Sequence, residues 1–122
     1  AFAQKNNKMV FLDFTGYGCV NCRKMEGAVF SNEKVKERLA DFVQIQLFVD
    51  DRTTLQNPFV ISEINDTIMT VGEKWSFLQQ YKFKANAQPY YLILSSEGKL
   101  LSKPYAYDEN IEKFLNWLNS VE

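Results

Sequence analysis

Histidine is absent from this sequence, and cysteine occurs only twice, as Cys19 and Cys22. Without histidine the chain lacks the commonest general base and metal ligand in proteins. A zinc site needs four ligands, and two cysteines without histidine supply too few of the usual ones. We therefore expect no metal and no separate cofactor, so that any chemistry rests on the two thiols.

Long apolar runs and runs of positive charge are also missing. The longest uninterrupted apolar run is 90–94, far short of the ~20 residues that span a bilayer. The chain has 14 basic and 15 acidic residues, and no basic stretch could neutralise a row of phosphates, so nucleic-acid binding is not expected. No signal peptide is visible and the chain begins at Ala1, so we expect a processed protein or a domain of a longer one.

What is present indicates one soluble globular domain over residues 1–122. The composition is 46% hydrophobic, 15% aromatic and 24% charged, which is enough apolar material to bury a core. There is no internal repeat and no low-complexity linker that would mark a second domain.

The hydrophobic patterns predict the order of strands and helices. The predicted strands cover residues 8–14, 42–49, 89–94 and 99–102. The predicted helices cover residues 19–30, 33–40 and 72–83, followed by a last helix that includes 111–118. Ser31 or Asn32 is expected to cap the second helix and Asp108 the last one. Residues 50–70 lack a regular pattern and are expected to form a long connection.

This order of elements predicts an α/β fold with a central mixed β-sheet flanked by helices. The first two strands are joined through helices, which favours parallel pairing. The last two strands are joined by a turn at 95–98, which favours an antiparallel hairpin.

The two cysteines lie where a strand and a glycine-containing turn run into a helix. A thiolate at a helix start faces unpaired backbone N–H groups, which lower its pKa below the ~8.5 of a free thiol. The spacing of Cys19 and Cys22 places the second sulfur one turn further on, within disulfide reach. The first thiolate can then attack a partner's disulfide and the second can resolve the mixed disulfide, so the pattern predicts thiol–disulfide exchange.

Three other interpretations of the pair remain open. It could be half of a zinc site, although the remaining ligands are lacking. It could be a structural bridge, although a two-residue loop restrains little of the unfolded chain. It could also be two unrelated core cysteines, which the strand–turn–helix setting disfavours.

Two carboxylates are further candidates. Glu26 follows Cys22 by four positions, so both share one stripe of the predicted helix; the alternative is an exposed partner of Arg23. Asp13 interrupts an apolar strand, where a buried charge is costly; the alternative is an exposed acid at the sheet edge. Pro89 opens a buried strand and could follow a cis peptide bond, but the local sequence alone favours an ordinary trans bond.

Several of these segments resemble the thioredoxin superfamily over nearly the whole chain. Residues 11–26, together with 47–51, 74–75 and 86–89, are more narrowly similar to the family of C-terminal domains of the bacterial membrane protein DsbD, the thiol:disulfide interchange protein. The resemblance implies a thioredoxin-like fold in which Cys19 is the nucleophile and Cys22 the resolving thiol.

The resemblance also implies roles for the surrounding residues. Asp13 and Glu26 would be the acids that tune the thiols, and we expect them to hold the pKa of Cys19 above what its helix position alone would give. Apart from the resemblance, a partly buried Asp13 could act as a general base and accept the proton of Cys22. Pro89 would be a cis-proline facing the active site. The residues expected to line the docking surface for a substrate are Gly18, Val20, Asn21, Gln88 and Pro89. This chain departs from thioredoxin at three places: Gly18 stands where thioredoxin has tryptophan, no proline lies between the two cysteines, and Gln88 precedes Pro89. Because these positions line the docking surface, the departures bear on the choice of partner.

The implied function is that of a disulfide reductase domain in the periplasm, at the C-terminal end of an inner-membrane protein. It would accept electrons from a transmembrane partner and pass them to other thiol–disulfide domains and protein disulfides, in the redox supply that includes cytochrome c biogenesis. We expect the domain to be monomeric. A free-standing thioredoxin-like reductase and a redox-inactive binding module are the alternatives.

Overall fold

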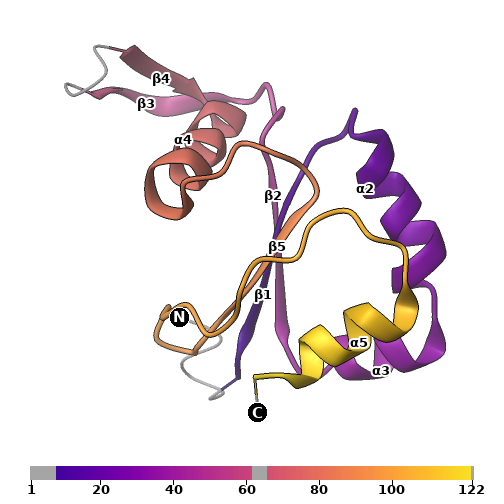
Figure 1. Cartoon of the computed structure of the whole chain (residues 1–122). Helices are drawn as coiled ribbons and strands as arrows, with labels where there is room; N and C mark the ends of the chain where they lie inside the picture. Colours follow the sequence, from indigo (N-terminus) through magenta and orange to yellow (C-terminus); the bar gives the residue numbers. More distant parts are fainter. Residues whose placement is uncertain (1–7, 62–65, 122) are drawn as a thin grey trace.

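A mixed sheet forms the centre of the computed structural model, which describes residues 8–61 and 66–121. Its strand order is β2-β1-β5 (Figure 1). The central strand β1 (Val10–Thr15) pairs in parallel with β2 (Val43–Phe48) and antiparallel with β5 (Tyr90–Leu94). The α/β class and the parallel first pair are therefore confirmed.

β1 is buried along its whole length because it is paired on both edges and covered on both faces. Its side chains alternate between two apolar clusters, as the pleat of a strand requires. Phe11 belongs to one cluster, while Leu12 and Phe14 belong to the other. Asp13 and Thr15 are the polar exceptions in this strand, and both are buried.

The helices cover the two faces of the sheet (Figure 1). On one side lie α2 (Val20–Met25), its continuation in the wider π-helical turn η1 (Glu26–Phe30), α3 (Glu33–Leu39) and α5 (Ile111–Asn119). On the other side lies α4 (Val71–Phe83), which begins with a capping box formed by Thr70 and Glu73. Within the described ranges, every helix is too short or too polar to serve as a membrane span.

The expectation of an irregular connection over residues 50–70 is wrong. This segment contains β3 (Thr54–Ile61) and β4 (Asp66–Thr70), which pair antiparallel in a separate two-stranded sheet. Figure 1 shows this hairpin projecting beside the start of α4. Pro58 makes this segment look unlike a strand in the sequence, because proline has no N–H to donate to a neighbouring strand. In a two-stranded sheet each strand is an edge strand, where proline is tolerated. The register shifts between Thr54 and Phe59, the stretch that holds Pro58.

The predicted strand over residues 99–102 is also not a continuous strand. The turn at 95–98 is present, with Gly98 at φ 91°, a conformation that favours glycine. Beyond it the chain meets β5 only at single bridges, Leu94 with Leu100 and Tyr91 with Tyr105. Between them the hydroxyl of Ser102 accepts the N–H of Ile93 at 3.2 Å, so a side chain replaces part of the ladder.

The helix caps were predicted with mixed success. Asn32, one of the two candidates, caps α3 by accepting the N–H groups of Lys34 and Val35. The cap of α5 is Asn110 and not Asp108, because the Asn110 side chain accepts the N–H of Lys113. The Asp108 carboxylate instead binds the N–H of Asn110 and the ammonium group of Lys113.

Candidate active site

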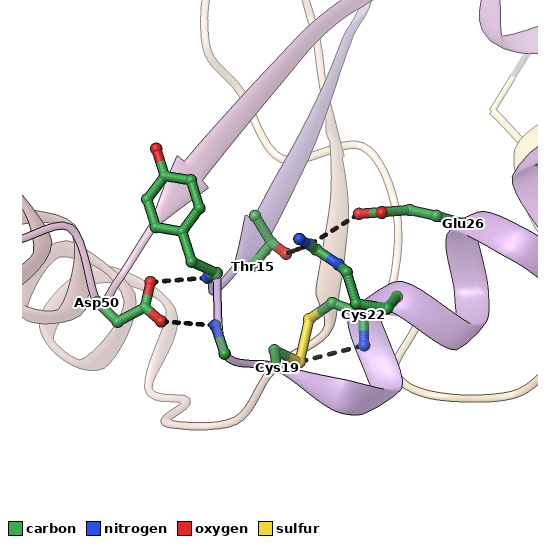
Figure 2. Close-up of polar contacts among 8 residues, drawn as sticks. Thr15, Cys19, Cys22, Glu26 and Asp50 are labelled. Atoms are coloured by element: carbon green, nitrogen blue, oxygen red, sulfur yellow. Dashed lines mark hydrogen bonds and ion pairs between the residues drawn. A yellow bond between two sulfur atoms is a disulfide. The ribbon is translucent and has the colours of Figure 1, made fainter.

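Cys19 and Cys22 form a disulfide at the start of α2 (Figure 2). Cys19 is the N-cap of the helix, with an extended backbone, and the two Cα atoms are 5.2 Å apart. The backbone N–H of Cys22 donates to the sulfur of Cys19 at 3.2 Å. After reduction, this donor would stabilise a thiolate on Cys19, because a hydrogen bond to the charged form favours that form.

The two sulfurs differ in their access to solvent. Cys22 is 2% exposed, whereas Cys19 is half-buried and lies at the surface end of the pair. Val20 and Tyr17 beside it are 66% and 62% exposed, and Gly18 is also exposed. A partner can therefore reach Cys19 but not Cys22. This fits the roles that the resemblance implies, while the order of reaction stays a prediction.

Asp13 is buried and not at an exposed edge, so the alternative reading of this acid is wrong. It is 3% exposed, and its Oδ1 atom has no hydrogen-bond partner among residues 8–61 and 66–121. Burial, and next the negative charge of Glu26, raise the pKa of Asp13 to about 7. A hydrogen bond from Gln46, its register partner on β2, and the charge of Arg23 act in the opposite direction. An acid with this pKa can exchange a proton at neutral pH.

Glu26 lies one turn beyond Cys22, as expected, but it is also the partner of Arg23. Its carboxylate binds the Arg23 guanidinium at 2.8 Å, and the two side chains are 37% and 42% exposed. The same Arg23 nitrogen donates to the hydroxyl of Thr15 at 3.1 Å, as Figure 2 shows. Glu26 thus joins a partly exposed ion pair, and its charge still raises the pKa of Asp13.

Asp50 was not singled out from the sequence, although it contacts the turn before Cys19. Its carboxylate accepts the backbone N–H of Tyr17 at 2.8 Å and that of Gly18 at 3.0 Å (Figure 2). Desolvation raises the pKa of Asp50, but hydrogen bonds from the N–H groups of Gly18, Tyr17 and Asp50 itself, together with the charge of Arg23, hold the pKa below the ordinary value. A signal existed: the carboxyl ends of parallel strands meet at one edge, and Asp50 closely follows β2 as the cysteine turn follows β1.

The Gln88–Pro89 peptide bond is cis, as the resemblance implied and contrary to what the local sequence favoured. The Gln88 side chain, expected at the docking surface, donates to the side chain of Gln79 at 2.8 Å. Gln79 is fully buried and donates in turn to the carbonyl of Ala87 at 2.7 Å. Gln88 is therefore anchored inside the domain through its amide nitrogen. That Pro89 faces the cysteines stays a prediction, as does substrate contact by Asn21.

Metal chemistry finds no support in the described part of the chain. No group of three or more Cys, His, Asp or Glu side chains there is arranged to hold a metal ion.

Several solved structures share this fold. A thioredoxin from Thermus thermophilus has a TM-score of 0.67 at 20% identity, covering 98% of this chain and 78% of that one. The reduced DsbD C-terminal domain of Neisseria meningitidis has a TM-score of 0.64 at 18% identity, covering 99% and 89%. A DsbH oxidoreductase has a TM-score of 0.63 at 16% identity, covering 98% and 78%. At these identities the likeness shows the fold alone.

The family assignment comes from the sequence. No curated protein matches the chain, but the family described as thioredoxin-like domain matches residues 1–122. Such domains work through a redox-active disulfide and not a separate cofactor, and the Cys19–Cys22 disulfide is consistent with a thiol–disulfide oxidoreductase. The chain belongs to the family of thioredoxin-like domains.

Proposed function

We propose that this domain is a protein-disulfide reductase of the DsbD type. The observation that carries the proposal is the pair of unequal sulfurs at one helix start, with Cys19 accessible and Cys22 only 2% exposed. Disulfide exchange needs one sulfur that meets the partner and a second that waits within reach. A purely structural bridge needs no such difference in exposure.

The reaction proceeds in two exchange steps. The Cys19 thiolate attacks one sulfur of the substrate disulfide, that S–S bond breaks, and the other substrate sulfur leaves and takes up a proton. Cys22 then attacks Cys19 in the mixed disulfide and releases the second substrate thiol. Two electrons pass from the domain to the substrate, and the domain ends with the Cys19–Cys22 disulfide drawn in Figure 2.

Asp13 serves the second step as a general base. Cys22 is buried and must lose its proton before it attacks. Asp13 is also buried and has a pKa of about 7, so it is able to take that proton at neutral pH. Its charge also disfavours a second negative charge nearby, which restrains the thiols until a partner docks.

We further propose where the electrons come from and where they go. The domain accepts them from a transmembrane partner in the periplasm and passes them to other thiol–disulfide domains and protein disulfides, including those that serve cytochrome c biogenesis. The support is the similarity of residues 11–26 to DsbD C-terminal domains. If the native gene encodes no membrane helices upstream of Ala1, a free-standing reductase is the better assignment.

The test is reduction of insulin disulfides, driven by a small dithiol, by the domain and its two serine variants. We expect turnover by the unmodified domain and none by either variant. In a separate reaction without the dithiol, reduced Cys22→Ser should accumulate a mixed disulfide with insulin, whereas reduced Cys19→Ser should not, because it lacks the attacking sulfur. A folded domain without turnover would instead be a binding module. Trapping by Cys19→Ser would reverse the assigned roles.

A further inference from the structure

The side chain of Asp50 binds the turn that immediately precedes Cys19. Both carboxylate oxygens of Asp50 are engaged: Oδ1 accepts the N–H of Tyr17 at 2.8 Å, and Oδ2 accepts the N–H of Gly18 at 3.0 Å. Figure 2 shows the two bonds side by side, immediately before Cys19. Hydrogen bonds to an ionised acceptor are roughly twice as strong as those between neutral groups.

The turn is shaped to receive this carboxylate. The Cys19 N–H donates to the carbonyl of Gly16 at 3.2 Å, so residues 16–19 form a tight turn. A Cβ atom at Gly16 would lie 3.2 Å from Oδ2 of Asp50, closer than ordinary van der Waals contact. The absence of a side chain at this position leaves the carboxylate room to lie against the backbone.

Backbone hydrogen bonds on both sides of Asp50 fix the segment 49–51. The N–H of Val49 donates to the carbonyl of Thr15 at 3.0 Å, which ties this segment to the end of β1. On the other side the N–H of Gly72 donates to the carbonyl of Asp51 at 2.9 Å. A Cβ atom at Gly72 would come within 2.6 Å of the Val49 carbonyl, so the start of α4 packs directly on the backbone around Asp50.

We propose that Asp50 is a positioning residue for the nucleophile, which sets the reactivity of Cys19 by holding the backbone of Tyr17 and Gly18. The proposal rests on the proposed function, in which Cys19 attacks first. Asp50 bonds to the turn and not to the sulfurs. Its effect is indirect: a fixed Gly18 keeps Cys19 at the N-cap, where its sulfur receives the N–H of Cys22 at 3.2 Å.

Asp50 could influence the pKa of Cys19 through its hydrogen bonds to the turn or through its negative charge, and the loss of each would shift that pKa in opposite directions. A loosened N-cap weakens the hydrogen bond to the thiolate and raises the pKa of Cys19, whereas removal of a nearby negative charge lowers it. The two roles are therefore separable by the direction of the change. Asp51→Asn is the matched control, because it removes one charge from the next position. Its amide oxygen can still accept the N–H of Thr53, as Asp51 does at 2.8 Å.

The experiment is the pH profile of iodoacetamide alkylation of Cys19 in the reduced domain, with Cys22→Ser as the common background. The other charged groups around the site, Asp13, Arg23 and Glu26, are unchanged in every variant. We expect Asp50→Asn and Asp50→Ala to shift the profile to higher pH, so that alkylation at pH 7 slows by about three- to tenfold. Asp51→Asn should leave the profile in place or move it slightly to lower pH.

The outcomes are distinct. The proposal would be overturned if a folded Asp50 variant had an alkylation profile that was unchanged or shifted to lower pH. An unchanged profile would mean that Asp50 does not affect Cys19, and a shift to lower pH would mean that only its negative charge does. If Asp50→Ala does not fold, Asp50→Asn decides, because it keeps the shape and one acceptor oxygen. Alkylation needs no disulfide substrate, so a failure of insulin reduction with a shifted profile would count against the proposed function and not against this role.

Discussion

Two aspartates near the carboxyl ends of the neighbouring strands β1 and β2 have opposite surroundings. Asp13 lies inside β1, is 3% exposed, and has an oxygen without a partner among the described residues. Asp50 lies beyond the end of β2, is exposed, and has both oxygens bound to backbone N–H groups. Burial raises the pKa of Asp13 to about 7, whereas several backbone hydrogen bonds and the charge of Arg23 together lower the pKa of Asp50 in spite of its desolvation.

The difference separates two tasks that one residue type can perform. Asp13 changes its charge near neutral pH and is therefore suited to moving a proton. Asp50 stays ionised throughout that range and is suited to holding a backbone. The surroundings, and not the amino acid, decide which task each carboxyl group performs. The following predictions test this contrast, from the largest expected effect to the smallest.

The largest expected effect is on the pH dependence of the free energy of unfolding. The pKa of Asp13 is about 7 in the fold against an ordinary value of 3.8, so the folded state binds more protons between these values. Stability conferred by the protonated acid is complete below about pH 4 and is lost as the pH rises through about 7. Asp13→Asn should remove this loss and make the oxidised domain more stable at pH 8 by up to about 4 kcal/mol.

Urea unfolding of the oxidised domain at pH 5 and pH 8 would measure this effect. Asp50→Asn is the control, because the pKa of Asp50 is lowered and its carboxylate remains ionised at both pH values. The loss of stability caused by Asp50→Asn should therefore be the same at pH 5 and pH 8. An equal fall in stability for the unmodified domain and Asp13→Asn would show that Asp13 does not titrate in this range.

The second prediction concerns the resolving step. If Asp13 takes the proton of Cys22, Asp13→Asn should slow the decay of the mixed disulfide at pH 7 by roughly 100-fold, within the range for general-base catalysis. Rapid quenching with acid would follow the mixed disulfide over time. Alkylation of Cys19 should not slow, since removal of a nearby negative charge favours its thiolate. Equal slowing of both reactions would mean that Asp13 only maintains the structure.

The smallest effect is expected at Glu26. Glu26→Gln removes a charge that raises the pKa of Asp13, so the pH dependence of stability should move to lower pH. The pKa of Cys19, measured by thiolate absorbance, should fall as well. The lost ion pair with Arg23 is partly exposed and should cost no more than about 1 kcal/mol.

Glu37→Gln provides the matched control for Glu26→Gln. Glu37 is an exposed acid on α3 and is not among the groups that shift the pKa of Asp13. Its replacement should leave the pH dependence of stability and the thiolate absorbance of Cys19 unchanged. A Glu26 variant that behaves like this control would reduce Glu26 to a surface partner of Arg23.

Local patterns were sufficient for much of the fold. The apolar run of β1 and the periodicity of α3, α4 and α5 depend on neighbours in the chain, and these elements lie where the sequence predicts them. The β3–β4 hairpin was missed because Pro58 ordinarily argues against a strand, and only the pairing partner makes the strand visible. The cap of α5 was misplaced by two residues because Asp108 and Asn110 are both good cap residues.

By itself, the sequence determined the chemistry of this domain. Two thiols three positions apart, at the point where a strand and turn become a helix, can close into a disulfide without any distant partner. The electrostatic setting of those thiols was decided by the tertiary structure. Asp50 reaches the turn across 32 and 33 positions of the chain because β1 and β2 run in parallel. Asp13 acquires its raised pKa because two neighbouring strands and the packed helices exclude water from it, a property that no local spacing encodes.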